Sequence, residues 1–152
     1  MMSAFRVGVV AVNPKNEKIV TGPITALVDT GSELTWLPAP ELTGIGITPR
    51  RRRTFITATG ERLQREIGYA IVRAEGYETT DEVVFGRQGD QVLLGVRTLE
   101  GFAVTVDPIG HRLVAQATLA CVISRSLELG SGRTQPWIRD GGAVPVADRS
   151  MP

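Results

Sequence analysis

Hydrophobic residues recur at every second position along most of residues 5–115, and this period constrains the fold more than any other feature of the sequence. Residues 5–11 (FRVGVVA) show it clearly. Such alternation puts apolar side chains on one face of a strand, and turn residues such as Gly, Pro and Asn separate the alternating segments. Further strands are expected at residues 19–28, 35–37, 53–58, 61–74, 77–85, 91–95, 103–106 and 112–115. The sequence therefore predicts an all-β domain.

Two segments depart from this alternation. Residues 96–101 are expected to form one or two helical turns closed by Gly101. From about residue 127 onward the chain is rich in Gly, Pro, Ser and charged residues without any period, while residues 118–129 fit either a strand or a short helix. We expect one domain over residues 1–116 and a largely irregular or disordered extension over residues 117–152.

Composition argues against several classes of protein. The 17 Lys and Arg and 16 Asp and Glu residues give a net charge of +1, so there is no global field for nucleic acid or an anionic membrane. The arginines at 50–53 could suggest a nucleic-acid patch, but they fall on both faces of a strand or in a loop. They are therefore expected to be solvated and not to form a binding patch. No apolar run reaches the roughly 20 residues of a membrane span, and the first residues lack a signal-peptide layout. With a single cysteine, Cys121, the sequence predicts a cytoplasmic protein.

An aspartate at the end of an apolar strand is the strongest pointer to chemistry. In ITALVDTGSELTWLP, residues 24–38, Asp29 is followed at once by Thr30, Gly31 and Ser32. Two carboxyls close together share one proton, so that one can activate a water while the other donates to a carbonyl. Glycine lets the backbone approach a bound peptide, and the hydroxyls can fix the turn. The chain holds one such segment, so the acid pair requires two copies meeting on a twofold axis.

Two short segments resemble a known family. LVDTGS, residues 27–32, resembles the active-site motif of aspartic proteases, and the short chain resembles their retroviral type, the retropepsins. VLLG at 92–95, followed by Arg97, is similar to the hydrophobic-hydrophobic-Gly segment that packs beside the catalytic turn in this family. The run LLGVRTLEGFAVTVDPIGHRLV at 93–114 resembles the small microbial single-domain members. The resemblance covers about residues 5–115.

The resemblance implies a closed, barrel-like retropepsin fold with one short helix and a flap hairpin. It implies that Asp29 is catalytic, that Thr30 braces the dimer across the twofold axis, and that Gly31 meets the substrate. Ser32 would add a hydrogen bond to the carboxylate, and Leu94 and Gly95 would support the turn. By position, the substrate-binding flap comprises Thr57, Ala58, Thr59, Gly60 and Glu61. The family uses neither a metal nor a cofactor.

The implied activity is that of an aspartic endopeptidase, acting as a homodimer on a peptide or protein substrate. The alternative is a catalytically silent retropepsin-like dimer that binds extended peptides. Several features depart from the retroviral pattern. The flap carries a single glycine, Gly60, more than thirty residues follow the last expected strand, and Thr98 replaces the usual polar residue after Arg97.

Other candidate residues receive a structural interpretation. His111 and Cys121 could form a nucleophilic dyad, but His111 sits in a turn and is expected at the surface. One His and one Cys also argue against a protein-bound zinc ion. Trp36 is expected to be a core residue. Three further aspartates are expected in solvent, in turns or at polar edges: Asp81, Asp90 and Asp107.

Overall fold

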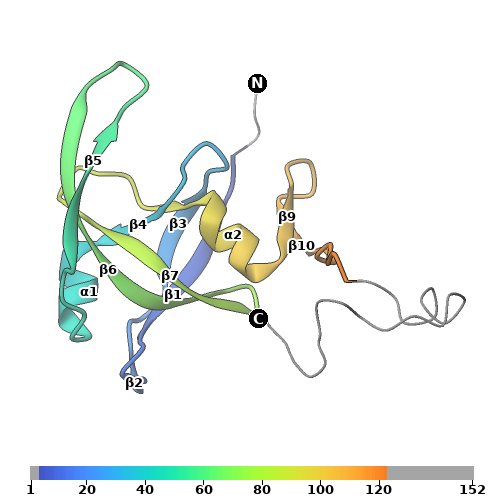
Figure 1. The fold of residues 1–152 in the computed structure, drawn as a ribbon, viewed down its shortest axis with the longest axis horizontal. Coiled ribbons are helices and arrows are strands. Elements are labelled where there is room, and N and C mark those ends of the chain that lie inside the picture. Colours follow the sequence, from blue (N-terminus) through green and yellow to red (C-terminus); the bar gives the residue numbers. More distant parts are fainter. Residues whose placement is uncertain (1–3, 123–152) are drawn as a thin grey trace, which may run out of the picture. The chain divides into compact units, whose positions relative to one another are not determined.

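The computed structural model describes residues 4–122 of the chain, and strands dominate this part (Figure 1). The strands are β1 (Arg6–Asn13), β2 (Asn16–Val20), β3 (Ile24–Val28), β4 (Thr35–Pro38), β5 (Arg51–Ile56), β6 (Arg62–Ala74), β7 (Tyr77–Gly86), β8 (Leu93–Leu94), β9 (Val104–Asp107) and β10 (Arg112–Ala115). Two short helices accompany them, α1 (Ala39–Gly44) and α2 (Val96–Phe102). The predicted all-β class is confirmed, and α2 lies where a helix was expected. None of the helices in the described part is long and apolar enough to cross a membrane.

The structure differs from the sequence prediction in three places. The strand expected over residues 19–28 is split into β2 and β3 around Pro23, whose nitrogen carries no hydrogen for a sheet ladder. Helix α1 follows Pro38 at a point where only the end of a strand was expected. Of the extension expected at 117–152, residues 117–122 contain no strand or helix, and residues 123–152 lie outside the described residues.

The strands close into a barrel-like ring. Eight strands pair in the order β2-β1-β3-β8-β4-β7-β6-β5, and β1 also pairs with β6 from Val9↔Ala74 to Val12↔Ile71. This extra pairing joins β1, β3, β8, β4, β7 and β6 into a closed ring, which leaves β2 and β5 as its outer strands. The expected barrel is therefore confirmed, and β9 and β10 form a separate two-stranded sheet.

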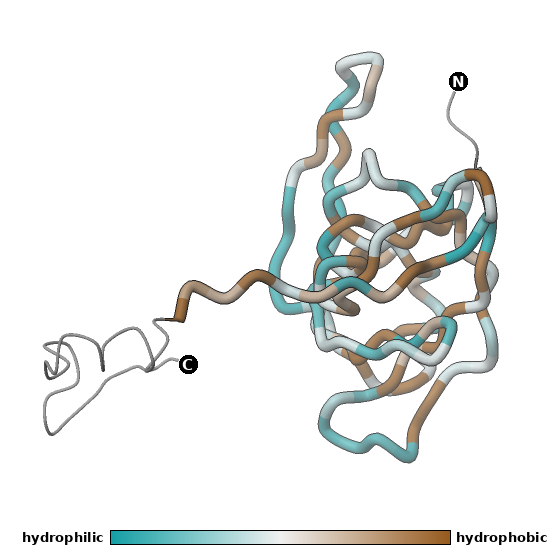
Figure 2. Tube along the Cα trace, turned by 90° about the vertical axis from the view of Figure 1, so that its right-hand side faces the viewer, coloured by the Kyte–Doolittle hydropathy of each residue, from teal (hydrophilic) through white to brown (hydrophobic). Residues whose placement is uncertain are grey.

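The hydrophobic core follows the alternation of the sequence. Inward residues of the ring strands are fully buried, including Val9, Leu37, Val72, Val83 and Leu94. A smaller cluster comprises Leu34, Ile67 and Val84, with Trp36 and Phe55 packed against it. Hydrophobic and hydrophilic residues alternate along the trace of this part of the chain (Figure 2). Trp36 is partly buried, as a residue at the margin of a core cluster.

Strands β5 and β6 form the predicted hairpin, which extends at the upper left of Figure 1. Its turn is closed by its own hydrogen bonds: Thr57 N–H donates to the Glu61 carbonyl at 2.9 Å, and Gly60 N–H donates to the Thr57 carbonyl at 2.9 Å. Gly60 has a φ of +89°, a conformation that side chains disfavour, so the turn depends on a glycine at this position.

Candidate active site

Asp29 directly follows β3, which is one of the strands of the closed ring. Strand β3 runs parallel to β8, with Val28 opposite Leu94. The backbone N–H of Asp29 donates to the Leu94 carbonyl at 3.0 Å, and that of Leu27 donates to the Val92 carbonyl at 2.9 Å. The two sequence motifs, at residues 27–32 and 92–95, are thus neighbours in the sheet.

A tight backbone turn orients the Asp29 carboxylate. The N–H of Gly31 donates to Oδ1 of Asp29 at 2.9 Å, and the N–H of Ser32 donates to the Asp29 carbonyl at 3.2 Å. A Cβ added at Gly31 would lie 3.2 Å from the same Oδ1, so the close approach favours glycine. Asp29 is half-buried, whereas Thr30 and Gly31 are exposed.

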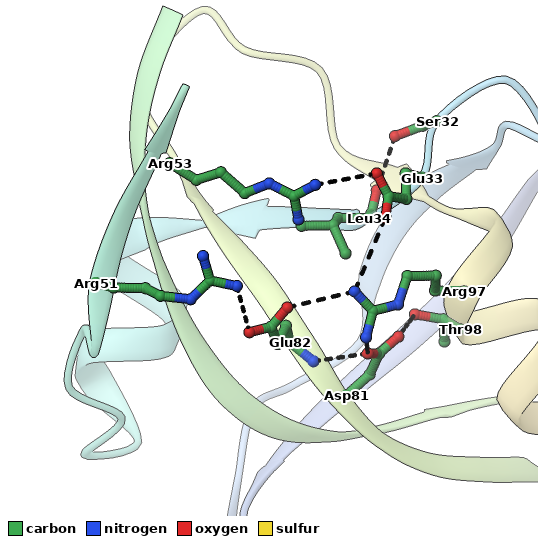
Figure 3. A network of polar contacts seen from close by, with 9 residues as sticks. All are labelled: Ser32, Glu33, Leu34, Arg51, Arg53, Asp81, Glu82, Arg97 and Thr98. Carbon is green, nitrogen blue, oxygen red and sulfur yellow. Dashed lines mark hydrogen bonds and ion pairs between the residues drawn. The ribbon is translucent and has the colours of Figure 1, made fainter. Parts of the chain in front are cut away.

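Ser32 does not make the expected hydrogen bond to Asp29. Its hydroxyl donates instead to the carbonyl of Leu34 at 2.7 Å (Figure 3). A hydroxyl has one proton to donate, and the Leu34 carbonyl, two residues along, is the acceptor that the loop offers. Ser32 therefore stabilises the loop after the carboxylate and not the carboxylate itself.

The start of α2 holds this loop from the other side. The N–H of Val96 donates to the Ser32 carbonyl at 2.7 Å, and the N–H of Arg97 donates to the Glu33 carbonyl at 3.0 Å. A Cβ at Gly95 would lie 2.3 Å from the Leu34 carbonyl oxygen, far inside contact distance. Only glycine at position 95 allows the helix start to approach the Asp29 loop this closely.

Two buried threonine hydroxyls, linked by hydrogen bonds, hold the backbone of Gly95 in place. The N–H of Gly95 donates to Oγ1 of Thr35 at 2.9 Å, and the hydroxyls of Thr35 and Thr98 lie 2.6 Å apart. Thr98 in turn donates to Oδ2 of Asp81 at 3.1 Å. Thr35 and Thr98 are fully buried, so each hydroxyl requires a partner inside the protein. Sequence reasoning missed these hydrogen bonds because the residues that they join are 63 and 17 residues apart.

The expectation that Asp81 and Asp90 lie in solvent is wrong. The Asp81 side chain is 9% exposed and sits 3.7 Å from Nη2 of Arg97. Asp90 accepts two hydrogen bonds from the Arg65 guanidinium, at 2.7 and 2.9 Å. This fork-like hydrogen bonding holds the pKa of the Asp90 carboxyl below its usual value. Both aspartates are structural ions paired within the protein.

Charged side chains connect the β5–β6 hairpin to the Asp29 loop (Figure 3). Arg53 of β5 pairs with Glu33 at 3.2 Å, and Arg51 of β5 pairs with Glu82 at 2.7 Å. Arg97 lies between the two acids, 3.3 Å from Glu82 and 4.0 Å from Glu33. The hydrogen bond from Arg51 lowers the pKa of the Glu82 carboxyl. Arg51 and Arg53 thus share the face of β5 that meets acids, as strand alternation requires.

Aromatic packing joins the same face of the hairpin to the strand after the loop. The rings of Phe55 and Trp36 lie 5.0 Å apart at 59°, and the Arg53 guanidinium lies 5.6 Å over the Phe55 ring. The predicted flap residues, Thr57 to Glu61, form the hairpin tip and are mostly exposed. The tip is therefore a preformed turn, and the base of its hairpin is joined to the Asp29 loop by the Arg53–Glu33 ion pair.

Each of the two alternative catalytic groups, His111 and Cys121, is exposed. His111 is exposed and stacks on the Phe5 ring at 5.5 Å, with the two rings nearly parallel at 5°. Cys121 is exposed and is not in a disulfide. In the described part of the chain no group of three or more His, Cys, Asp or Glu side chains is arranged to hold a metal ion.

Comparisons with known proteins add little to this geometry. No family model matches the chain, and no curated protein matches it. The simian foamy virus (mac) protease superposes with a TM-score of 0.44 at 19% identity, over 63% of this chain and 92% of that one. A protein of unknown function from Legionella pneumophila superposes with a TM-score of 0.42 at 20% identity, over 68% of this chain and 90% of that one.

Proposed function

We propose that the protein is a retropepsin-like aspartic endopeptidase whose active site forms between two copies of the chain. The observation that carries the proposal is the half-buried Asp29 carboxylate, set on a backbone-fixed turn after a central strand and held by the Gly95 segment. Catalytic groups are commonly placed in this way, on a rigid support but open to a substrate.

The proposed mechanism uses the two Asp29 carboxyls as a coupled pair. When the two carboxyls lie within hydrogen-bond distance of each other they share one proton, because two negative charges so close together repel strongly. The ionised carboxylate accepts a proton from a water, which attacks the peptide carbonyl carbon. The protonated carboxyl donates its proton to the carbonyl oxygen, and the tetrahedral species then collapses with protonation of the leaving nitrogen. No covalent intermediate with the protein forms.

Residues around Asp29 receive roles from their positions. Thr30 and Gly31 are exposed beside the carboxylate, where Thr30 can meet its counterpart in the second copy and Gly31 can approach the substrate backbone. The hairpin tip, Thr57 to Glu61, would cover an extended peptide lying over the Asp29 loop. The Arg53–Glu33 ion pair would keep the base of this hairpin in register with the loop.

A mixing experiment tests the shared site. Asp29→Asn keeps the size of the side chain and removes the ionisable group, so dimers should still form. When equal amounts of wild type and mutant exchange subunits at random, about a quarter of the dimers carry two aspartates. Cleavage of an unfolded protein substrate per total protein should fall to about a quarter of the pure wild-type rate.

The control is the same mixture made with Asp107→Asn, which should leave the rate unchanged. A rate near one half in the Asp29→Asn mixture would mean that each chain carries a complete site, which contradicts the proposal. No cleavage by pure wild type, together with saturable binding of an extended peptide, would favour the silent peptide-binding dimer.

A further inference from the structure

A pocket of about 270 Å³ lies away from the Asp29 loop. Its walls are the β1–β2 turn, the segment between α1 and β5, and the side chains of Tyr69 on β6 and Thr80 on β7. Strand β1 is antiparallel to β3, so Asn13 lies beyond the start of β3 while Asp29 follows its end. The β1–β2 turn is accordingly at the bottom of Figure 1, away from the β3–β4 loop. The pocket shares no lining residue with the candidate active site.

The walls of this pocket are fixed by hydrogen bonds and close packing. The Asn13 side chain donates to the Ile45 carbonyl at 2.8 Å and accepts from the N–H of Lys15 at 2.8 Å, which joins the β1–β2 turn to the end of α1. A Cβ at Gly68 would lie 3.0 Å from the Thr48 carbonyl oxygen, so glycine lets this wall pack directly on β6. The pocket is therefore preformed.

Its chemistry combines apolar surface with two positive charges. Pro14, the buried Ile47 and the Tyr69 ring supply apolar walls. Lys15 and Arg50 also line the pocket, and none of the nine lining residues is acidic. Neither cation forms an ion pair within residues 4–122, in contrast to Arg51 and Arg53 on the neighbouring strand.

Arg50 is held at the rim of the pocket. Its guanidinium lies 5.3 Å over the Tyr69 ring, and its backbone N–H donates to the Ile67 carbonyl at 2.7 Å. Stacking on an aromatic ring orients the guanidinium while leaving its edge for an anion. Tyr69 is 44% exposed, so its ring is also available to a ligand.

We propose that this pocket binds a small carboxylate that carries an aromatic or aliphatic group. The carboxylate pairs with the guanidinium edge of Arg50 and the ammonium of Lys15, and the apolar group contacts Pro14, Ile47 and Tyr69. A planar carboxylate matches the two parallel N–H groups of an arginine. A doubly charged phosphate has a larger desolvation cost against these apolar walls. The volume is close to the lower end of the range of roughly 300–1,000 Å³ for ligand pockets, which favours a small molecule.

This site goes beyond the proposed peptidase function and does not depend on it. Binding is therefore measured on the full chain carrying Asp29→Asn, so that cleavage plays no part. The probe is indole-3-acetate, followed by titration of the backbone amide signals of Thr48, Tyr69 and Thr80. The neutral indole-3-acetamide and phenyl phosphate are titrated in parallel.

We expect saturable shifts with indole-3-acetate and affinity at least about tenfold weaker for the amide, since the amide lacks the charge that pairs with the two cations. Arg50→Gln and Lys15→Gln should each weaken binding at least about fivefold. Arg52→Gln removes one positive charge from the same arginine run without touching the pocket, and should change the affinity less than about twofold.

Three results would overturn the proposal. One is the absence of saturable shifts up to about 10 mM probe, because the affinity would then be far weaker than that of a built binding site. Another is equal binding of acid and amide, or an equal effect of Arg52→Gln and Arg50→Gln. The third is tighter binding of phenyl phosphate than of indole-3-acetate, which would assign the pocket to phosphate ligands.

Discussion

Two turns of this protein place an aspartate shortly before a glycine, and they use the carboxylate in different ways. After β3, Oδ1 of Asp29 accepts a hydrogen bond from the N–H of Gly31 at 2.9 Å. At β9, Oδ1 of Asp107 accepts two, from Ile109 at 3.1 Å and Gly110 at 2.9 Å. The second oxygen of Asp107 lies 3.3 Å from Nε of Arg112.

The difference lies in what makes each turn rigid. The Asp107 carboxylate holds its own turn together, and the N–H of Gly110 is the main cause that lowers its pKa. The Asp29 turn has the internal bond from Gly31 and is also held by backbone groups of neighbouring elements, the Leu94 carbonyl and the N–H groups at the start of α2. Support from outside leaves a carboxylate available for chemistry, whereas a carboxylate that caps its own turn is committed to structure.

The largest expected effect separates the two aspartates by activity. Asp29→Asn should reduce kcat/KM for peptide cleavage on the order of a thousandfold or more, because it removes the group that exchanges protons. Asp107→Asn should change it less than about twofold. Both are measured on the same fluorogenic peptide pool, with circular dichroism to verify folding. Similar losses in the two variants would show that Asp29 is no more catalytic than Asp107.

A smaller effect separates the two turns by packing. Gly95→Ala puts a Cβ 2.3 Å from a backbone carbonyl, and we expect a loss of about 1–3 kcal/mol in the free energy of unfolding. Gly110→Ala meets mainly the Asp107 side chain, at 2.6 Å, which can rotate away, so the loss should be smaller.

Gly8→Ala on β1 is the matched control for these substitutions. Its Cβ would have no neighbour within 4 Å, so the free energy of unfolding should change by less than about 0.5 kcal/mol. The three variants are compared by urea denaturation. Equal stability of Gly95→Ala and Gly8→Ala would mean that the Asp29 loop moves freely away from α2.

The smallest effect concerns pH. Since the pKa of Asp107 is lowered in the folded state, its contribution to stability is complete well above the unfolded pKa of about 3.9 and is lost as the pH falls through the folded value. The difference in urea midpoint between wild type and Asp107→Asn should therefore be constant from about pH 7 to 5 and shrink below about pH 4. Arg112→Gln should keep most of this difference, because the Gly110 N–H is the larger cause. A difference that does not change with pH would contradict this account.

The period of two predicted most strands because it reflects burial on one face of a sheet, which each strand expresses locally. It failed where one residue type has two uses. Strand β4 ends at Pro38, but proline also suits the first turn of a helix, and Pro40 lies in the first turn of α1. The closed ring and the nearness of Asp29 to Gly95 came from the resemblance of two motifs and not from periodicity.

Contacts between distant polar residues were beyond sequence reasoning. The sequence around Asp81 is polar, like that around many exposed strand residues, and gives no sign that its side chain is buried. The burial depends on Thr98 and Arg97, which approach from α2. The hydroxyl of Ser32 donates to the Leu34 carbonyl and not to the Asp29 carboxylate, because the conformation of the loop brings this carbonyl within hydrogen-bond distance. Such contacts depend on tertiary geometry, for which the sequence carries no local signal.

The position of β8 in the sheet has a consequence for synthesis of the chain. This strand of two residues, Leu93 and Leu94, lies between β3 and β4, which are made some sixty residues earlier. Until Leu94 has emerged from the ribosome, the N–H groups of Leu27 and Asp29 have no sheet partner, and the ring lacks the strand between β3 and β4. A nascent chain therefore cannot order the Asp29 loop until nearly the whole barrel has been translated. If the loop is catalytic, proteolysis begins only after the domain that controls it is complete.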